Sequence, residues 1–196
     1  MKHTLLSFIF STAMAASASA GATVLFNDNF DGEALALNAS LSNWDVSGGT
    51  IDVIGSGFFD FYPGNGHYLD LDGTTGNAGK ITTNTLFSLT PGMTYQLDFD
   101  LGGSTRGETN SVVVSLGSYS ETFTLASGAG LQHVTRAITV LGSMSSSLSF
   151  DHAGGDNLGL ILDNVNVSAV PEPSTYALLL AGLGLIGFSV RRRISR

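Results

Sequence analysis

Aromatic side chains gather in one short segment, residues 57–68, whose sequence is GFFDFYPGNGHY. Its glycines and its proline are typical of a loop, so these rings do not all fit in a core. Sugars stack on exposed rings framed by a few polar groups, and an exposed apolar patch indicates a binding site. The candidate ligand-binding residues are Trp44, Phe58, Phe59, Phe61, Tyr62, His67 and Tyr68. The alternative is that the rings cover an open end of the fold and that Trp44 packs in the core.

Carboxylates are the second set of side chains that can do chemistry. The chain between its two ends holds fifteen acids, all but Glu172, and only three bases, Lys80, Arg106 and Arg136, so its formal charge is −12. Such a domain repels nucleic acid and anionic lipid headgroups, and it attracts divalent cations. We therefore expect no nucleic-acid partner.

The first acidic turn fits only part of a calcium-binding loop. Asn27, Asn29 and Asp31 have the spacing of the first ligands of an EF-hand. The twelfth position is Asn38, where that loop requires a bidentate Glu, and no flanking helix pair is apparent. The sequence therefore argues against an EF-hand.

Catalytic motifs are missing from the sequence. It contains no G-x-S-x-G elbow, no H-E-x-x-H pair and no P-loop, and the absence of cysteine excludes thiol catalysis and disulfides. Asp151, His152 and Asp156 form the least implausible catalytic cluster. We expect no catalytic residues and no enzyme activity, with a polysaccharide-acting enzyme as the third possibility for the function.

The N-terminus has the three parts of a secretory signal peptide. Lys2 and His3 precede a mostly apolar run from Leu5 to Ala16, and small residues follow. Ala18-Ser19-Ala20 fits the cleavage rule, which makes residues 1–20 the signal peptide and Gly21 the first mature residue. A domain of residues 21–169 follows, and residues 170–196 form a tail.

The tail combines prolines, an apolar run and a basic end. Residues 175–190 carry no charge and predict a short transmembrane helix of about 24 Å, against a hydrocarbon core of ~30 Å. The prolines at 171 and 173 keep the helix from extending upstream. Arginines at 191–193, within the basic end 191–196, favour a cytoplasmic C-terminus.

This order of elements resembles the PEP-CTERM sorting signal over residues 171–196. The resemblance implies that an exosortase-like membrane enzyme recognises Pro171, Glu172 and Pro173, removes the helix and passes the protein to the surface or to an exopolysaccharide matrix. The three residues are then part of a substrate. The alternative is an ordinary single-pass anchor.

Short strand patterns fill the domain between these signals. In residues 95–101 Tyr, Leu, Phe and Leu alternate with Gln and Asp, as in a half-buried antiparallel strand. Similar runs, including a continuous one over 80–89, are separated by Gly, Asn and Ser turns. The sequence predicts an all-β fold, a sandwich of two antiparallel sheets.

The domain also resembles jelly-roll, galactose-binding-like modules, among them the choice-of-anchor surface domains. The motifs that carry this resemblance are the acidic turn at 27–31, the Trp strand at 43–46, Gly-x-x-Tyr at 92–95 and Leu-Asp-Asn-Val at 162–165. In such modules the first and last strands are neighbours and a structural calcium joins them. The resemblance implies calcium ligands at Asp28, Asp31 and Asp163; the alternative is that these side chains cap turns.

The sequence as a whole predicts an exported, non-catalytic surface or matrix protein, associated with exopolysaccharide or biofilm. Its expected partners are the export machinery, an exosortase-like enzyme, the inner membrane before processing and extracellular polysaccharide. The second possibility is a carbohydrate-binding module with one definite glycan. No cofactor is expected apart from the structural calcium.

Overall fold

The computed structural model describes residues 21–170 and 173–194. The signal peptide predicted for residues 1–20 and two of the sorting residues, Pro171 and Glu172, lie outside the described residues. The β-rich domain and the C-terminal helix are separate units.

The domain is built almost entirely of strands. They are β1 (Thr23–Asp28), β2 (Trp44–Ser47), β3 (Asp52–Gly55), β4 (His67–Asp70), β5 (Lys80–Thr83), β6 (Phe87–Leu89), β7 (Thr94–Gly102), β8 (Thr109–Leu116), β9 (Tyr119–Ala126), β10 (Gln132–Thr139), β11 (Met144–Ser146), β12 (Leu148–Ala153) and β13 (Ile161–Val170).

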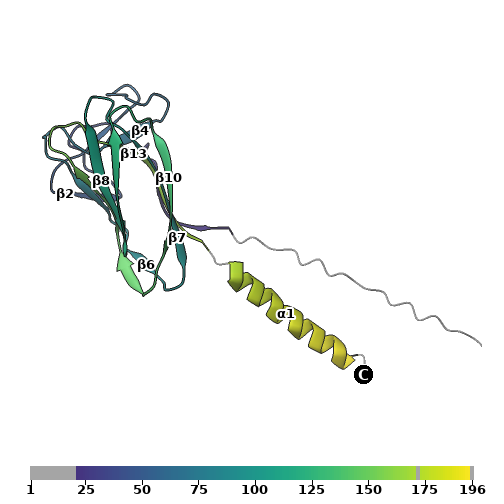
Figure 1. Cartoon of the computed structure of the whole chain (residues 1–196). Helices are drawn as coiled ribbons and strands as arrows, with labels where there is room; N and C mark the ends of the chain where they lie inside the picture. The colour runs from purple at the N-terminus through teal and green to yellow at the C-terminus, as the bar shows by residue number, and fades with distance from the viewer. Residues whose placement is uncertain (1–20, 171–172, 195–196) are drawn as a thin grey trace, which may run out of the picture. The chain divides into compact units, whose positions relative to one another are not determined.

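These strands form two large antiparallel sheets and one small one, which confirms the predicted sandwich (Figure 1). One large sheet has the order β10-β7-β13-β4-β3, with β1 paired to β13. The other has the order β2-β5-β12-β8-β9, and β6 pairs with β11 in a two-stranded sheet. The first and last strands are therefore neighbours, as the jelly-roll resemblance implies.

Strand β7 explains how the sequence places its side chains. Tyr95, Leu97 and Phe99 are buried between the sheets, whereas Gln96 and Asp98 lie on the outer face. The period of two residues in the sequence becomes one dry and one polar face of the sheet.

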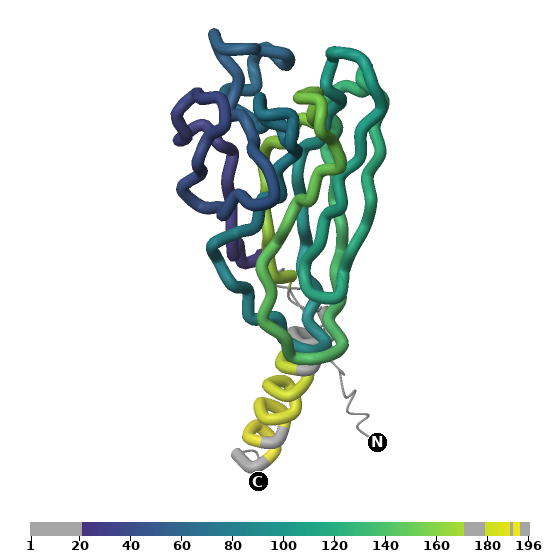
Figure 2. Tube along the Cα trace, turned by 90° about the vertical axis from the view of Figure 1, so that its left-hand side faces the viewer, coloured from purple at the N-terminus to yellow at the C-terminus, as the bar shows by residue number. Residues whose placement is uncertain are grey.

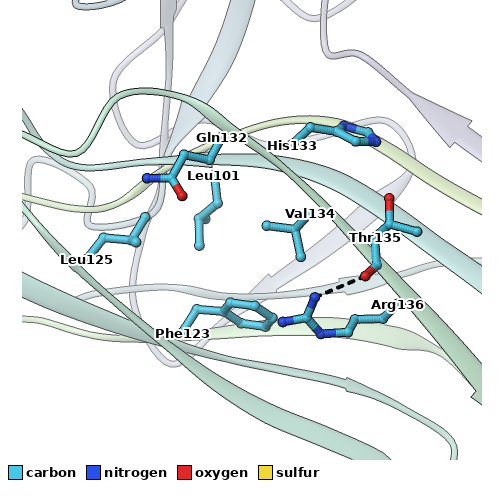
Figure 3. Close-up of a pocket in the computed structure, with 8 residues that line it drawn as sticks. All are labelled: Leu101, Phe123, Leu125, Gln132, His133, Val134, Thr135 and Arg136. Atoms are coloured by element: carbon cyan, nitrogen blue, oxygen red, sulfur yellow. Dashed lines mark hydrogen bonds between the residues drawn. The ribbon is translucent and has the colours of Figure 1, made fainter.

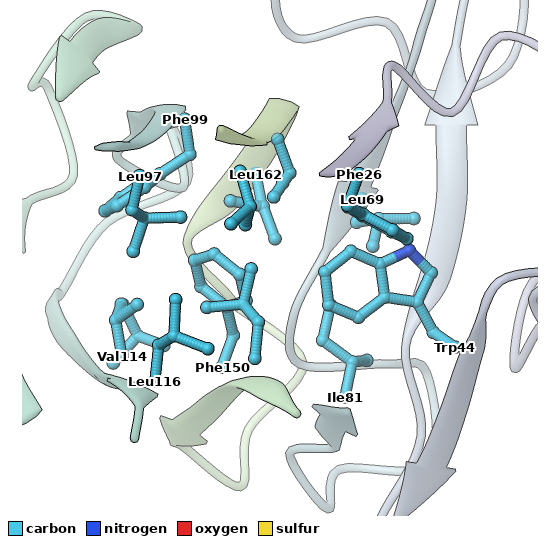
Figure 4. Packing of buried hydrophobic residues seen from close by; sticks show 14 of the residues in the cluster. Phe26, Trp44, Leu69, Ile81, Leu97, Phe99, Val114, Leu116, Phe150 and Leu162 are labelled. Atoms are coloured by element: carbon cyan, nitrogen blue, oxygen red, sulfur yellow. The ribbon is translucent and has the colours of Figure 1, made fainter. Parts of the chain in front are cut away.

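Aliphatic and aromatic side chains together fill the middle of the sandwich (Figure 4). Phe150 packs edge-on against Phe99, with ring centroids 5.3 Å apart, and it also contacts Trp44. Trp44 in turn contacts Phe26 at 5.3 Å. Trp44 is 3% exposed, so it lies in the core, as the alternative for this residue predicts.

A second, smaller apolar cluster lies outside the main core. Ile54, Tyr68 and Ile161 are buried there beneath part of the aromatic segment 57–68, together with Leu131. The Tyr68 hydroxyl accepts hydrogen bonds from the backbone N–H groups of Phe61 and Tyr62, at 2.6 and 2.9 Å. The aromatic loop is thereby fixed to the sheet.

The C-terminal unit is one helix, α1 (Pro173–Ile194). Its start at Pro173 agrees with the expectation that the prolines limit it upstream, because proline is well accommodated in a first helical turn. Nowhere in the described part of the chain does a helix have the length and apolar character needed to cross a membrane.

Candidate functional site

One small cleft contains part of the aromatic segment. Its volume is about 170 Å³. We call it the Phe59 cleft, and its walls come from five separate stretches of the chain. The lining residues are Leu37, Asp52, Ile54, Phe59, Phe61, Asp70, Thr74, Arg106 and Asn157.

Phe59 supplies the exposed ring of this cleft. Its side chain is 56% exposed, and its backbone is in the left-handed region with φ of 51°. A tight turn, in which Gly55 and Phe58 exchange backbone hydrogen bonds of 2.9 and 2.7 Å, immediately precedes Phe59. The ring of Phe58 packs edge-on against that of Phe59 at 4.8 Å and supports it.

Arg106 connects several of the residues that line the cleft. Its guanidinium forms an ion pair with Asp70 and donates to the Asn157 carbonyl at 2.7 Å. The same group lies 4.8 Å from the centre of the Phe61 ring, within cation–π range. One side chain thus joins two loops and a strand.

Asp70 is a buried carboxyl, with only 3% of its side chain exposed. Burial raises its pKa to about 6, against the opposing effects of the Arg106 guanidinium and the Asp72 backbone N–H. The ion pair therefore offsets a large desolvation cost.

Asp52 forms the polar floor. It accepts hydrogen bonds from the backbone N–H of Asn38 at 2.7 Å and from the backbone N–H and hydroxyl of Thr74 at 3.2 and 2.7 Å. The carboxylates of the cleft are thus held by donors of the chain itself. A rigid polar wall beside an exposed ring suits a ligand rich in hydroxyl groups.

The remaining residues of the aromatic segment have structural positions. Tyr68 is fully buried, and burial raises its pKa to about 12. The Tyr62 hydroxyl lies 2.8 Å from the carbonyl oxygens of both Gly103 and Ala129. His67 contacts the Glu33 carbonyl through Nδ1 at 3.0 Å. Of the seven candidates, only Phe59 and Phe61 line the cleft.

The polar residues of the cleft were missed at the sequence level. Asp52, Asp70, Thr74, Arg106 and Asn157 are scattered over more than a hundred positions, and no motif links them. One signal was available: Arg106 is one of three bases in a strongly acidic domain, and such a residue needs a partner.

A second hollow of about 290 Å³ opens between the edge strands β9 and β10 (Figure 3). Leu101, Leu125 and Val134 form its apolar part. Its phenyl ring, Phe123, already has the Arg136 guanidinium over it at 5.2 Å from the ring centre. A sugar stacking there would have to displace this contact, so the Phe59 cleft is the better candidate.

The three proposed calcium ligands are engaged by the chain. Asp28 accepts from the Trp44 indole N–H at 2.9 Å, the Asn43 amide at 3.1 Å and the Phe30 backbone N–H at 3.0 Å. These three donors leave part of the acceptor capacity of its two oxygens free, so Asp28 stays a proposed ligand. Through the indole contact it also anchors the core tryptophan.

Asp31 and Asp163 lie in a more anionic setting. Asp31 accepts from Asn29 and from the His67 backbone N–H, whereas Asp163 is 1% exposed and accepts mainly from the Asn164 backbone N–H at 2.7 Å. Burial raises the pKa of Asp163 to about 7, and the charges of neighbouring Asp100, Asp31 and Asp28 add to this effect. Within the described residues, no group of three or more His, Asp or Glu side chains is arranged to hold a metal ion.

The least implausible catalytic cluster, Asp151, His152 and Asp156, is not brought together as a triad. Asp151 and His152 are adjacent in β12, so their side chains point to opposite faces. Asp151 pairs with Lys80 at 3.6 Å on the surface, whereas His152 is buried and accepts from the Leu160 backbone N–H at 3.1 Å. Burial lowers the pKa of His152.

Comparison with known proteins identifies the tail. The PEP-CTERM protein-sorting motif matches residues 169–193, which confirms the sorting signal predicted from Pro171, Glu172 and Pro173. The chain therefore carries a sorting motif of exported proteins. No curated protein sequence matches the chain at a significant level.

Several solved structures are similar to the β-rich domain. The enzymatically active domain of tailspike protein 4 from bacteriophage CBA120 has 17% identity, with a TM-score of 0.46 over 66% of this chain and 20% of that one. The CBM22-1 xylan-binding domain from Paenibacillus barcinonensis has 14% identity, with a TM-score of 0.44 over 81% and 99%. The K3 cleaved adhesin domain of Lys-gingipain from Porphyromonas gingivalis has 16% identity, with a TM-score of 0.44 over 74% and 99%. The chain spans only a fifth of the tailspike chain.

Proposed function

We propose that this exported protein is non-catalytic and binds extracellular polysaccharide through the Phe59 cleft. The observation that carries the proposal is the exposed Phe59 ring, which lines the same cleft as the Arg106–Asp70 ion pair. An aromatic face and fixed polar groups together suit the two surfaces of a sugar, one apolar and one made of hydroxyl groups.

The size and charge of the site narrow the ligand class. Its volume of about 170 Å³ is below the ~300–1,000 Å³ of pockets for drug-sized ligands, which favours one or two sugar units over a long buried chain. The formal charge of −12 for residues 21–170 repels acidic polysaccharide at moderate ionic strength. We therefore propose a neutral glycan.

Replacing Phe59 with Ala is expected to weaken polysaccharide binding roughly 5- to 30-fold, which corresponds to the ~1–2 kcal/mol of a stacked aromatic contact. Because Phe59 is more than half exposed, thermal stability should change little. Affinity electrophoresis of the full chain in gels containing xylan, β-glucan or galactan measures the effect, with acidic alginate as the charged comparison.

The matched control is Leu86→Ala, which also removes an exposed apolar side chain (63% exposed) but lies outside the cleft. This variant should be retarded by the polysaccharide gels as strongly as the unchanged protein. If none of the neutral polysaccharides retards the chain, or if Phe59→Ala is retarded as strongly as the unchanged protein, polysaccharide binding at this cleft is refuted.

We also propose the route by which the protein reaches the surface. A signal peptide at residues 1–20 directs export, and α1 with its basic end holds the protein transiently at the inner membrane with a cytoplasmic C-terminus. An exosortase-like enzyme then recognises Pro171, Glu172 and Pro173 and removes the helix. The sorting motif at residues 169–193 supports this proposal.

The intact mass of the protein recovered outside the cell tests this route. We expect the mass of a chain that begins at Gly21 and ends at Pro173, without residues 174–196. Substitution of Glu172 with Ala should leave a membrane-bound form that retains the helix. An extracellular product of the same mass from the Glu172 variant would contradict recognition of this motif.

A structural calcium near Asp31 and Asp163 is a further proposal. Supporting it, Asp163 is buried near the carboxylates of Asp100, Asp31 and Asp28, and a divalent cation would relieve their mutual repulsion. Because a cation and a proton compete for the same carboxylate, thermal unfolding at several pH values with and without calcium tests this proposal.

A further inference from the structure

Several segments that are far apart in the sequence meet at one end of the sandwich (Figures 1 and 2). Thr94 lies opposite both Thr139 and Val170 across the sheet, and Ala169 lies opposite Thr23. At the same end β6 pairs with β11, and the Gly117 backbone N–H donates to the Ser146 hydroxyl at 2.9 Å. We call this end, formed by residues 23–25, 86–94, 117–119, 139–146 and 168–170, the uncharged tip.

The tip contains no charged residue although the domain is strongly acidic. Charges are missing from the whole of residues 81–97, 109–120 and 137–150. The nearest charged side chains along β9 and β10 are Glu121 and Arg136, which pair with each other at 2.7 Å. All of the net negative charge is thus displaced toward the rest of the domain.

Apolar side chains are exposed on this tip. Leu141 is 93% exposed, Leu86 63% and Val24 59%, and Met144 is 36% exposed. They belong to three separate segments that converge on one end, so each adds exposed apolar surface to the same tip. Exposed apolar surface that is gathered in one region marks protein or membrane contacts.

The chain itself favours a membrane as the occupant. Val170, the last residue of β13, lies in the tip, and α1 begins at residue 173. Three residues of extended chain reach at most about 11 Å. If α1 is at the membrane, as the proposed sorting route requires, the tip is held close to the lipid surface.

Charge distribution gives the same orientation. An anionic bilayer repels the acidic part of the domain, whereas the tip has no charge that opposes its approach. The Phe59 cleft lies near the other end of the ten-residue strand β13, where Asp70 pairs with Ile161, about 30 Å away along the strand. The cleft would then face away from the membrane.

We propose that the uncharged tip contacts the lipid bilayer while the protein is still anchored by α1. Leu141 and Leu86 enter the headgroup and acyl boundary, and the domain stands upright with the Phe59 cleft outward. This inference rests on the proposed anchoring of α1 and adds a second, separate contact with the membrane.

The absence of cysteine makes the test direct, because one introduced cysteine labels one site. The full chain is reconstituted in vesicles of phosphatidylcholine and phosphatidylglycerol that contain a nitroxide lipid. Environment-sensitive fluorophores are placed at Leu141→Cys in the tip, at Ser56→Cys in the loop after β3 and at Leu183→Cys in α1. We expect lipid quenching at least twofold greater at position 141 than at position 56, with position 183 also quenched.

A second substitution tests the role of the apolar side chains. Leu86→Asp should cut the quenching of the label at 141 by half or more and leave the label at 183 unchanged. Ser56→Asp, an equal change of charge at an exposed site outside the tip, should alter neither.

Each other outcome overturns a different part of the proposal. A quenched label at 183 with labels at 141 and 56 equally in water means that α1 is anchored but the tip does not bind lipid. A label at 183 in water refutes the anchoring and the tip contact together. Shielding of the label at 141 that needs no vesicles and rises with protein concentration assigns the tip to a second copy of the chain.

Discussion

Replacing Arg106 with Gln is expected to lower the free energy of unfolding by about 3–5 kcal/mol at pH 7.5, because it leaves the buried carboxylate of Asp70 without its partner. The substitution also removes the hydrogen bond to the Asn157 carbonyl and the contact with the Phe61 ring. Denaturation of the full chain in urea, followed by the fluorescence of Trp44, measures the change.

The loss of unfolding free energy in Arg106→Gln, relative to the unchanged protein, should depend on pH. The folded-state pKa of Asp70, about 6, is above the ordinary value of 3.8 even with Arg106 present, and removal of the guanidinium raises it further. The folded variant therefore binds a proton that the unfolded chain releases, and its deficit shrinks as the pH falls below that folded-state pKa. A deficit of equal size at pH 5 and pH 7.5 would show that packing contacts, and not the ion pair, account for it.

Arg136→Gln is the matched control. Arg136 also forms an ion pair, with Glu121 at 2.7 Å, but more than a third of each side chain is exposed. Exposed pairs contribute about 1 kcal/mol or less, so this variant should stay close to the unchanged protein.

The alternation of apolar and polar residues predicts the sandwich well but cannot assign strands to sheets. The run over residues 80–89 was predicted as continuous, whereas the structure divides it into β5 and β6. Asn84-Thr85-Leu86 interrupts the pairing, after which the chain enters the small sheet with β11. Which partner a strand finds depends on segments sixty residues away, and no local pattern contains that information.

The residues of the candidate site could also be predicted only in part from local sequence patterns. Local density of aromatic residues predicts Phe59 and Phe61 in the cleft, but it equally selects Tyr68, whose ring the fold buries. Trp44 is fixed in the core by the Asp28 carboxylate, a contact across sixteen positions. Burial and long-range hydrogen bonds separate residues that look alike in the sequence.

Replacing Asp163 with Asn is expected to stabilise the protein at pH 8 by about 2–4 kcal/mol in the absence of calcium. Asp163 is 1% exposed and its folded-state pKa is about 7, roughly three units above its ordinary value of 3.8. Each unit corresponds to ~1.4 kcal/mol, and the neutral amide avoids the cost of burying a charge. Thermal and urea unfolding of the full chain in a chelating buffer at pH 4, 6 and 8 measures the difference.

The sign of this pH dependence follows from proton binding. Between pH 4 and 7 the folded protein keeps a proton on Asp163 that the unfolded chain has lost, so stability falls as the pH rises through this window. The advantage of Asp163→Asn should therefore be near zero at pH 4 and largest at pH 8. Asp45→Asn, at an exposed position of β2, is the control and should show no such trend.

If calcium binds near Asp163, it reverses the stabilising effect of Asp163→Asn at pH 8. A bound cation stabilises the ionised carboxylate, so the unchanged protein should gain stability from calcium at pH 8 and lose it on chelation, whereas Asp163→Asn should respond to neither. In calcium the substitution then becomes destabilising. If the unchanged protein has the same unfolding midpoint in calcium as in chelator, the proposed calcium site is refuted. The proton then remains the species that neutralises Asp163, and the destabilisation caused by this carboxyl is smallest in acid.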